Sequence, residues 1–165
     1  MPLLKNWASE QEAGKEIDPR AKNSIELVRR TMMGLASQLD DHRETLASYT
    51  LVRTAKIDGS RAARNSNRVL ENRVAAIAEE QQLIRDLHKS IMEYIQVLNE
   101  HSVRNCQIKT KLLKMRYIDR LEWSEINRQV YGQNPDYNKK RTSYMRKMHR
   151  MVGAAYREIF FYWKG

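Results

Sequence analysis

The sequence predicts an all-helical protein in which a long heptad hairpin precedes a compact helix-turn-helix domain. The 165 residues include only six glycines and three prolines, and 30% of them are charged, a composition that favours helix over strands and turns. Two long stretches carry apolar residues at alternating steps of three and four. The last part of the chain holds a short helical pattern, a clear break and a strongly basic helical pattern.

The net positive charge of the chain comes from its C-terminal part. Residues 101–165 contain 15 lysines and arginines against 5 aspartates and glutamates, a net charge of +10, whereas residues 1–100 contain 15 of each. This division suggests that the neutral N-terminal part mediates assembly and that the basic C-terminal part binds a polyanion. Nucleic acid is the leading candidate for that polyanion.

Several classes of protein are disfavoured. A lone cysteine, Cys106, allows no internal disulfide. No run of about 18 apolar residues exists that would span a membrane, and the opening residues lack the apolar core of a signal peptide. We therefore expect a soluble cytoplasmic protein with no membrane partner.

The front part is predicted to be an N-terminal arm, residues 1–22, followed by a coiled-coil hairpin, residues 23–101. Asn23 or Ser24 is expected to cap the first helix, which should end near Lys56 before a turn signal. The first apolar stripe is Ile25, Val28, Met32, Leu35, Leu39, His42, Leu46 and Tyr49; the second is Leu70, Val74, Ile77, Gln81, Ile84, His88, Ile91, Ile95 and Leu98.

Each stripe is narrow, so a hairpin alone would leave much apolar surface in water. We therefore expect a homodimer or a higher homo-oligomer; the alternative is that both stripes form the core of an intramolecular bundle. His42 and His88 occupy stripe positions and are expected to approach each other, together with Gln81, as polar residues that fix register. The spacing suggests no metal site.

Residues 102–165 are predicted to form the helix-turn-helix domain. A first helix over about 108–120 has one apolar face, and Ser124 is expected at the start of a short second helix. Residues 132–136, Gly-Gln-Asn-Pro-Asp, break the pattern, and Asn138 is expected to cap the third helix.

The third helix has an apolar side and a basic side. Tyr144, Met148, Met151, Val152 and Ala155 can face inward. A helix-turn-helix places the first turns of its second helix in the major groove, where Arg, Lys, Ser and Thr contact bases and phosphates. The expected groove contacts are Lys139, Lys140, Arg141, Thr142, Ser143 and Arg146, with Lys147 and Arg150 on phosphates and Arg116, Arg120 and Arg128 flanking the backbone. The alternative is an ordinary solvated basic face.

Other chemistry is not indicated. The sequence has no phosphate-cradling Gly-rich loop, no HExxH motif and no Ser, His and Asp set in a recognisable context, so we expect neither an enzyme nor a cofactor. Tyr117 and Trp123 are expected in the core, and Cys106 is expected to be inert. The aromatic end, residues 156–163, either packs back on the helix-turn-helix or forms a partner surface.

Two stretches carry a resemblance. Residues 115–126, Met-Arg-Tyr-Ile-x-x-Leu-x-Trp-x-Glu-Ile, and residues 148–152, Met-His-Arg-Met-Val, resemble region 4 of bacterial sigma factors. More narrowly, they are similar to the phage regulators of the RinA and ArpU type found in prophages of Gram-positive bacteria, over about residues 105–158. Asn127 and Arg128 depart from that pattern, because small residues are usual there.

The resemblance implies sequence-specific binding of double-stranded DNA and regulation of late, packaging or lysis genes. It also implies RNA polymerase as a partner and the cytoplasm of a bacterial host as the location. Two alternatives stay open. One is a small terminase subunit that recognises phage DNA for packaging, and the other is a coiled-coil protein that docks a host factor.

Overall fold

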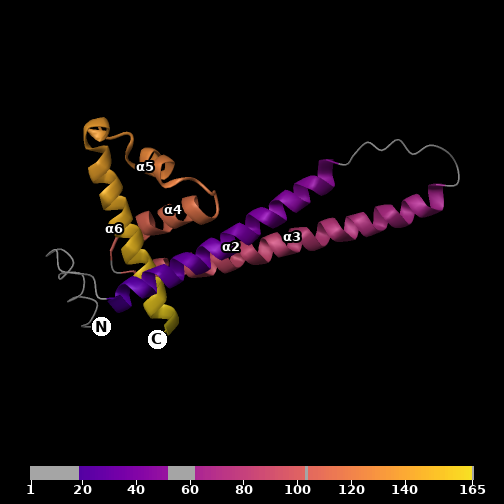
Figure 1. Ribbon diagram of the computed structural model, residues 1–165, viewed down its shortest axis with the longest axis horizontal. Helices are drawn as coiled ribbons and strands as arrows, with labels where there is room; N and C mark the ends of the chain where they lie inside the picture. Colours follow the sequence, from indigo (N-terminus) through magenta and orange to yellow (C-terminus); the bar gives the residue numbers. More distant parts are fainter. Residues whose placement is uncertain (1–18, 52–61, 103, 165) are drawn as a thin grey trace.

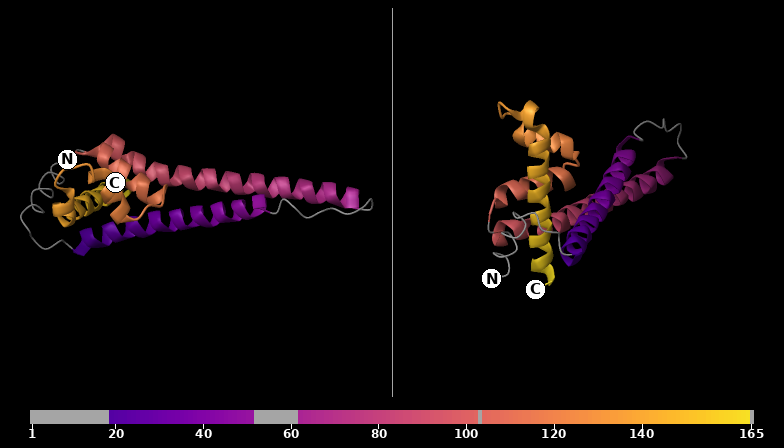
Figure 2. Two further views of the ribbon diagram at one scale, coloured as in Figure 1. Left: turned by 90° about the horizontal axis from the view of Figure 1, so that it is seen from above. Right: turned by 60° about the vertical axis from the view of Figure 1, so that its left-hand side comes forward.

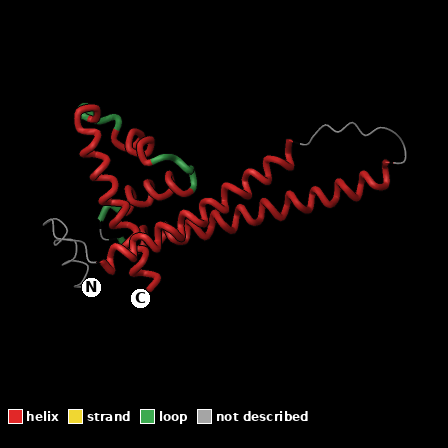
Figure 3. The backbone as a smooth tube through the Cα atoms, viewed as in Figure 1, coloured by secondary structure: helices red, strands yellow, loops and turns green. Residues whose placement is uncertain are grey.

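The computed structural model describes residues 19–51, 62–102 and 104–164, and every regular element within those ranges is a helix. The prediction of an all-α fold is therefore confirmed for the described residues (Figure 3). The helices, labelled as in Figure 1, are α2 (Pro19–Leu51), α3 (Ala62–His101), α4 (Cys106–Tyr117), α5 (Trp123–Tyr131) and α6 (Tyr137–Lys164).

The two long helices run side by side in opposite directions and make an elongated rod (Figures 1 and 2). The three shorter ones gather at the end of this rod where α2 begins and α3 ends, which we call its base. Helix α6 crosses the base, and its last turn emerges on the opposite side from α5. None of the described helices is both long and apolar enough to cross a membrane.

Helix α2 begins earlier than expected. It starts at Pro19, whose missing N–H is one that the first turn of a helix leaves unpaired in any case. Asn23 and Ser24 lie inside the helix, where Ser24 is only 3% exposed, so the predicted cap was wrong. The rest of the predicted arm (residues 1–18) and the predicted helix end near Lys56 lie outside the described residues.

The face that α3 turns to α2 differs from the predicted stripe. Glu80 and Leu87 are half-buried on this face, whereas Gln81 and His88 are exposed. His42 donates or accepts a hydrogen bond at 2.7 Å, through its Nδ1, with Glu80 Oε2. The predicted approach of His42 to His88 and Gln81 was therefore wrong. Ile84, Ile91, Ile95 and Leu98 of the predicted stripe are buried or half-buried, so only the positions predicted at Gln81 and His88 move, each by one residue. Leu70 and Val74 of the predicted stripe are exposed.

The core is continuous from the base of the rod into the short helices. Met32, Leu39, Ile91 and Ile95 of the rod are fully buried, and they belong to the same cluster as Leu112, Leu113, Ile126, Met148 and Ile159. Each such aliphatic side chain contributes about 1.5–3 kcal/mol by leaving water. At the base, the apolar stripes are thus buried within one chain. The predicted boundary at residue 101 coincides with the end of α3.

Candidate nucleic-acid interface

The short helix α5 lies between α4 and α6 and begins one residue before the predicted one. Its N-cap is Glu122 and its first residue is Trp123, so Ser124 lies inside the first turn and its predicted place as the cap of the helix was wrong. Ile126 is fully buried and Val130 is half-buried, as expected for the inner face. Glu125 lies in the first turn, where the helix dipole favours a negative charge.

A carboxylate organises the turn between α5 and α6. Asp136 Oδ2 pairs with Lys140 Nζ at 2.7 Å, and Asp136 Oδ1 accepts a hydrogen bond from the Tyr144 hydroxyl at 2.7 Å. The bond from Lys140, followed by that from Tyr144, lowers the pKa of Asp136. The backbone departs from helical geometry at Lys140 (φ −116°, ψ 19°), which separates the first turn of α6 from its main part. Asn138 lies inside that first turn, so its predicted capping role was wrong.

The first half of α6 is rich in exposed cations. We call the following set of exposed residues, which surrounds the first turns of α6 and then continues along one side, the basic face: Lys139, Lys140, Arg141, Thr142, Ser143, Arg146, Lys147 and Arg150. Ser143, Arg146 and Arg150 follow one another at steps of three and four, so they share a single line along the helix. On the opposite side, Met148 and Val152 are buried in the core, as expected.

Acidic residues offset very little of the positive charge of the basic face. The sequence contains no acidic residue between Asp136 and Glu158. Among the described residues, Lys140 is the one member of the basic face that forms an ion pair, with Asp136. Lys147 Nζ also lies 5.8 Å from the centre of the Tyr131 ring, a cation–π contact that sets its stem against α5.

The three flanking arginines differ in their surroundings. Arg116 donates to Leu121 O at 3.0 Å and to Glu122 Oε1 at 3.1 Å. Arg120, which adopts a left-handed backbone (φ 60°), donates to Asp40 Oδ2 of α2 at 2.5 Å. Both guanidinium groups are thus engaged within the chain. Arg128 is exposed on α5, beside the turn that leads to α6.

The two expected core aromatics differ in burial. Tyr117 is 1% exposed, which confirms its predicted place in the core. Trp123 is half-buried, with the Arg116 guanidinium 5.4 Å from its ring centre and the His149 ring edge-on at 5.7 Å. Its ring therefore links α4, α5 and α6 rather than standing free.

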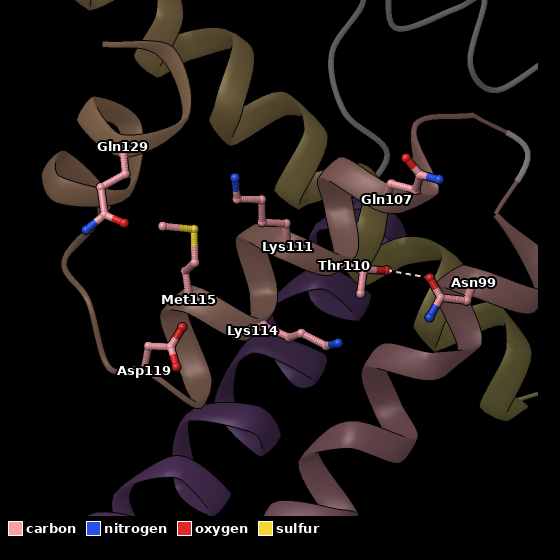
Figure 4. Close-up of a pocket in the computed structure, with 8 residues that line it drawn as sticks. All are labelled: Asn99, Gln107, Thr110, Lys111, Lys114, Met115, Asp119 and Gln129. Atoms are coloured by element: carbon pink, nitrogen blue, oxygen red, sulfur yellow. Dashed lines mark hydrogen bonds between the residues drawn. The ribbon is translucent and has the colours of Figure 1, made fainter. Parts of the chain in front are cut away.

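The sequence reasoning did not single out two lysines that lie near α5. Lys111 and Lys114 line an open groove of about 620 Å³, together with Asn99, Gln107, Thr110, Met115, Asp119 and Gln129 (Figure 4). Thr110 donates to Asn99 Oδ1 at 2.9 Å and closes the α3 side of this groove. The sequence could have indicated this pair, because Lys111 and Lys114 are three residues apart and therefore share the outer side of α4. Asp119, which lines the same groove, offsets part of their charge.

In the described part of the chain, no group of three or more His, Cys, Asp or Glu side chains is placed to hold a metal ion. Cys106 is a half-buried free thiol. Comparison with protein-family models, with curated proteins and with solved structures found no match. The resemblance to sigma region 4 and to the phage regulators therefore stays a prediction.

Proposed function

We propose that this protein binds double-stranded DNA sequence-specifically through the basic face of α6. The observation that carries the proposal is the exposure of all eight side chains of that face on a helix whose other side is anchored in the core. The rod packs against the other half of α6, where Tyr94 and His101 of α3 contact Trp163 and Tyr162. It leaves the basic face open.

The geometry matches the requirements of groove binding. The line formed by Ser143, Arg146 and Arg150 enters the major groove, where arginine can bridge the acceptors of a guanine and serine can reach a base or a phosphate. Lys147 and Arg128 lie toward α5 and contact the phosphate backbone. The first turn of α6, with Lys139 and Lys140, adds positive charge at the edge of the groove.

In our proposal the protein is a transcriptional regulator of a phage or prophage. The class of target genes (late, packaging or lysis) and the contact with RNA polymerase rest on the resemblance of residues 115–126 to sigma region 4. A homodimer fits this role, because helix-turn-helix proteins commonly read two half-sites related by a two-fold axis.

The test is selection of bound sequences from random duplexes, followed by measurement of affinity for the selected duplex and for an unrelated one. We expect a preference of about a thousandfold or more for the selected duplex. Replacing Arg146 and Arg150 by Ala should remove most of this preference, because each good bidentate contact contributes about 1–3 kcal/mol of discrimination.

The matched control removes the same charge from the rod. Arg85→Ala with Lys89→Ala acts on two exposed cations of α3, far along the chain from α6. This variant should keep the preference and lose affinity only slightly. If no duplex is enriched, or if both double variants weaken all duplexes equally and salt abolishes binding, the chain is attracted only by general charge and the proposal fails.

A further inference from the structure

The open groove lined by Lys111 and Lys114, which we call the α4 groove, faces away from α6. Lys109, Leu113 and Tyr117 follow one another at steps of four and share one side of α4. Lys109 Nζ lies 2.6 Å from an oxygen of Glu158 and Leu113 is fully buried, so this is the side that packs on α6. Lys111 is two residues from both, a turn of about 200°, and points to the opposite side.

The arginines of the basic face also point away from α4. Tyr156 lies on the buried side of α6, with its ring centre 6.5 Å from that of Tyr117 in α4. Arg146 and Arg150 are exposed, and each is two residues from the fully buried Met148. The α4 groove and these arginines are therefore on opposite sides of the helix-turn-helix domain. A duplex held by the arginines leaves the groove free for a different ligand.

Two lysines give the α4 groove its positive charge. Lys111 and Lys114 are exposed, and neither forms an ion pair with another described residue. Figure 4 shows them between Asn99 on one side and Gln129 and Asp119 on the other. The arrangement favours a ligand that carries two separate negative charges.

The rest of the lining suits a peptide. Asn99, Gln107 and Gln129 bring three amide side chains to the groove. An amide offers both donors and acceptors, which a peptide backbone needs. Met115, 7% exposed, supplies adaptable apolar surface for one side chain of the ligand. The volume of about 620 Å³ is within the range of clefts that hold small ligands.

The same lining does not suit single-stranded nucleic acid. Such strands are held by bases that stack on aromatic rings as well as by charge, and the α4 groove is lined by no aromatic residue. The aromatic end of the chain lies elsewhere. Its predicted packing on the helix-turn-helix is confirmed for Tyr156, whereas Trp163 contacts Tyr94 of the rod, with 5.4 Å between ring centres.

We propose that the α4 groove binds an extended acidic peptide segment of another protein. Lys111 and Lys114 are three residues apart on a helix, which places their Cβ atoms about 5–6 Å apart. Alternate residues of an extended peptide lie on one side at a spacing of about 6.6 Å. The groove therefore selects two acidic residues separated by one other. The proposal goes beyond DNA binding and does not depend on it.

The experiment is selection from a displayed library of random peptides by the full chain at physiological ionic strength. Enriched peptides should share two acidic residues separated by one position. Fluorescence anisotropy then measures the affinity of the most enriched peptide. Lys111→Ala with Lys114→Ala should weaken it about tenfold or more, because two charge pairs are lost. Circular dichroism establishes that the variant is folded.

Arg146→Ala with Arg150→Ala is the matched control, because it removes the same charge from the other side of the domain. It should change peptide affinity by no more than about twofold, since salt screens distant charges. The proposal is overturned if no acidic peptide is enriched or if both double variants weaken the peptide equally. It is also overturned if excess duplex displaces the peptide, which would mark the groove as a nucleic-acid surface. A chain that binds the peptide but no duplex would contradict only the proposed function.

Discussion

Tyr137 donates its hydroxyl to Asn127 Oδ1 at 2.8 Å and so ties the first residue of α6 to the middle of α5. Both side chains are buried, at 7% and 0% exposure. The expected resemblance to sigma region 4 predicts a small residue at position 127. In the structure, the polar side chain of Asn127 holds the start of the helix that carries the basic face.

This hydrogen bond gives a double-mutant prediction. Tyr137→Phe leaves Asn127 Oδ1 buried without its donor, and Asn127→Leu leaves the Tyr137 hydroxyl without its acceptor. Each single change should lower the free energy of unfolding by about 1–3 kcal/mol. The double variant should cost less than the sum of the two single changes, since it leaves neither group unpaired. Urea titrations measure all four proteins. Strictly additive single effects would show that the bond contributes nothing.

A buried ion pair joins α4 to α6. Lys109 Nζ lies 2.6 Å from Glu158 Oε1, and the two side chains are 5% and 18% exposed. Lys109→Met should destabilise the chain by about 3–5 kcal/mol, because a buried carboxylate loses its partner. The matched pair is Lys89–Glu93 on the surface of α3, at 4.0 Å and 76% and 54% exposed. Lys89→Met should change stability by no more than about 0.5 kcal/mol. Equal costs at the two sites would contradict this account.

Two buried tyrosines predict loss of stability at high pH. The hydroxyls of Tyr117 and Tyr156 lie 2.5 Å apart, and burial raises the pKa of both above the ordinary value of 10.0. Above about pH 10 the unfolded chain releases these protons while the folded chain keeps them. The unfolded state then binds fewer protons, so the free energy of unfolding falls as pH rises; below about pH 9 the pair contributes no pH dependence.

The measurement is urea unfolding at several pH values between 8 and about 11. Tyr156→Phe should make the fall above pH 10 shallower by about 1.4 kcal/mol per pH unit, because one titrating group is removed. A slope that Tyr156→Phe leaves as steep as before would show that the pair does not hold its protons.

Much of the fold follows from the sequence because periodicity and charge are local. The stripe of α2 through Val28, Met32 and Leu39, the burial of Tyr117 and the inner face through Met148 and Val152 were all predictable from spacing. The clustering of cations after Asp136 likewise needed only a count.

The remaining features depend on residues that are distant in the chain. The choice of Glu80 over Gln81 reflects how α2 packs on α3. The engagement of Arg120 comes from Asp40, 80 residues earlier.

Photo-crosslinking locates the DNA on the protein and tests the central proposal most directly. A photoreactive amino acid is placed at Ser143 on the basic face or, in a second protein, at Gln82 on the exposed side of α3. Each protein is irradiated with the selected duplex at physiological ionic strength. Efficient crosslinking from position 143 and little from position 82 is the predicted result. Equal crosslinking from both positions, or crosslinking from position 82 alone, would contradict a DNA interface on α6.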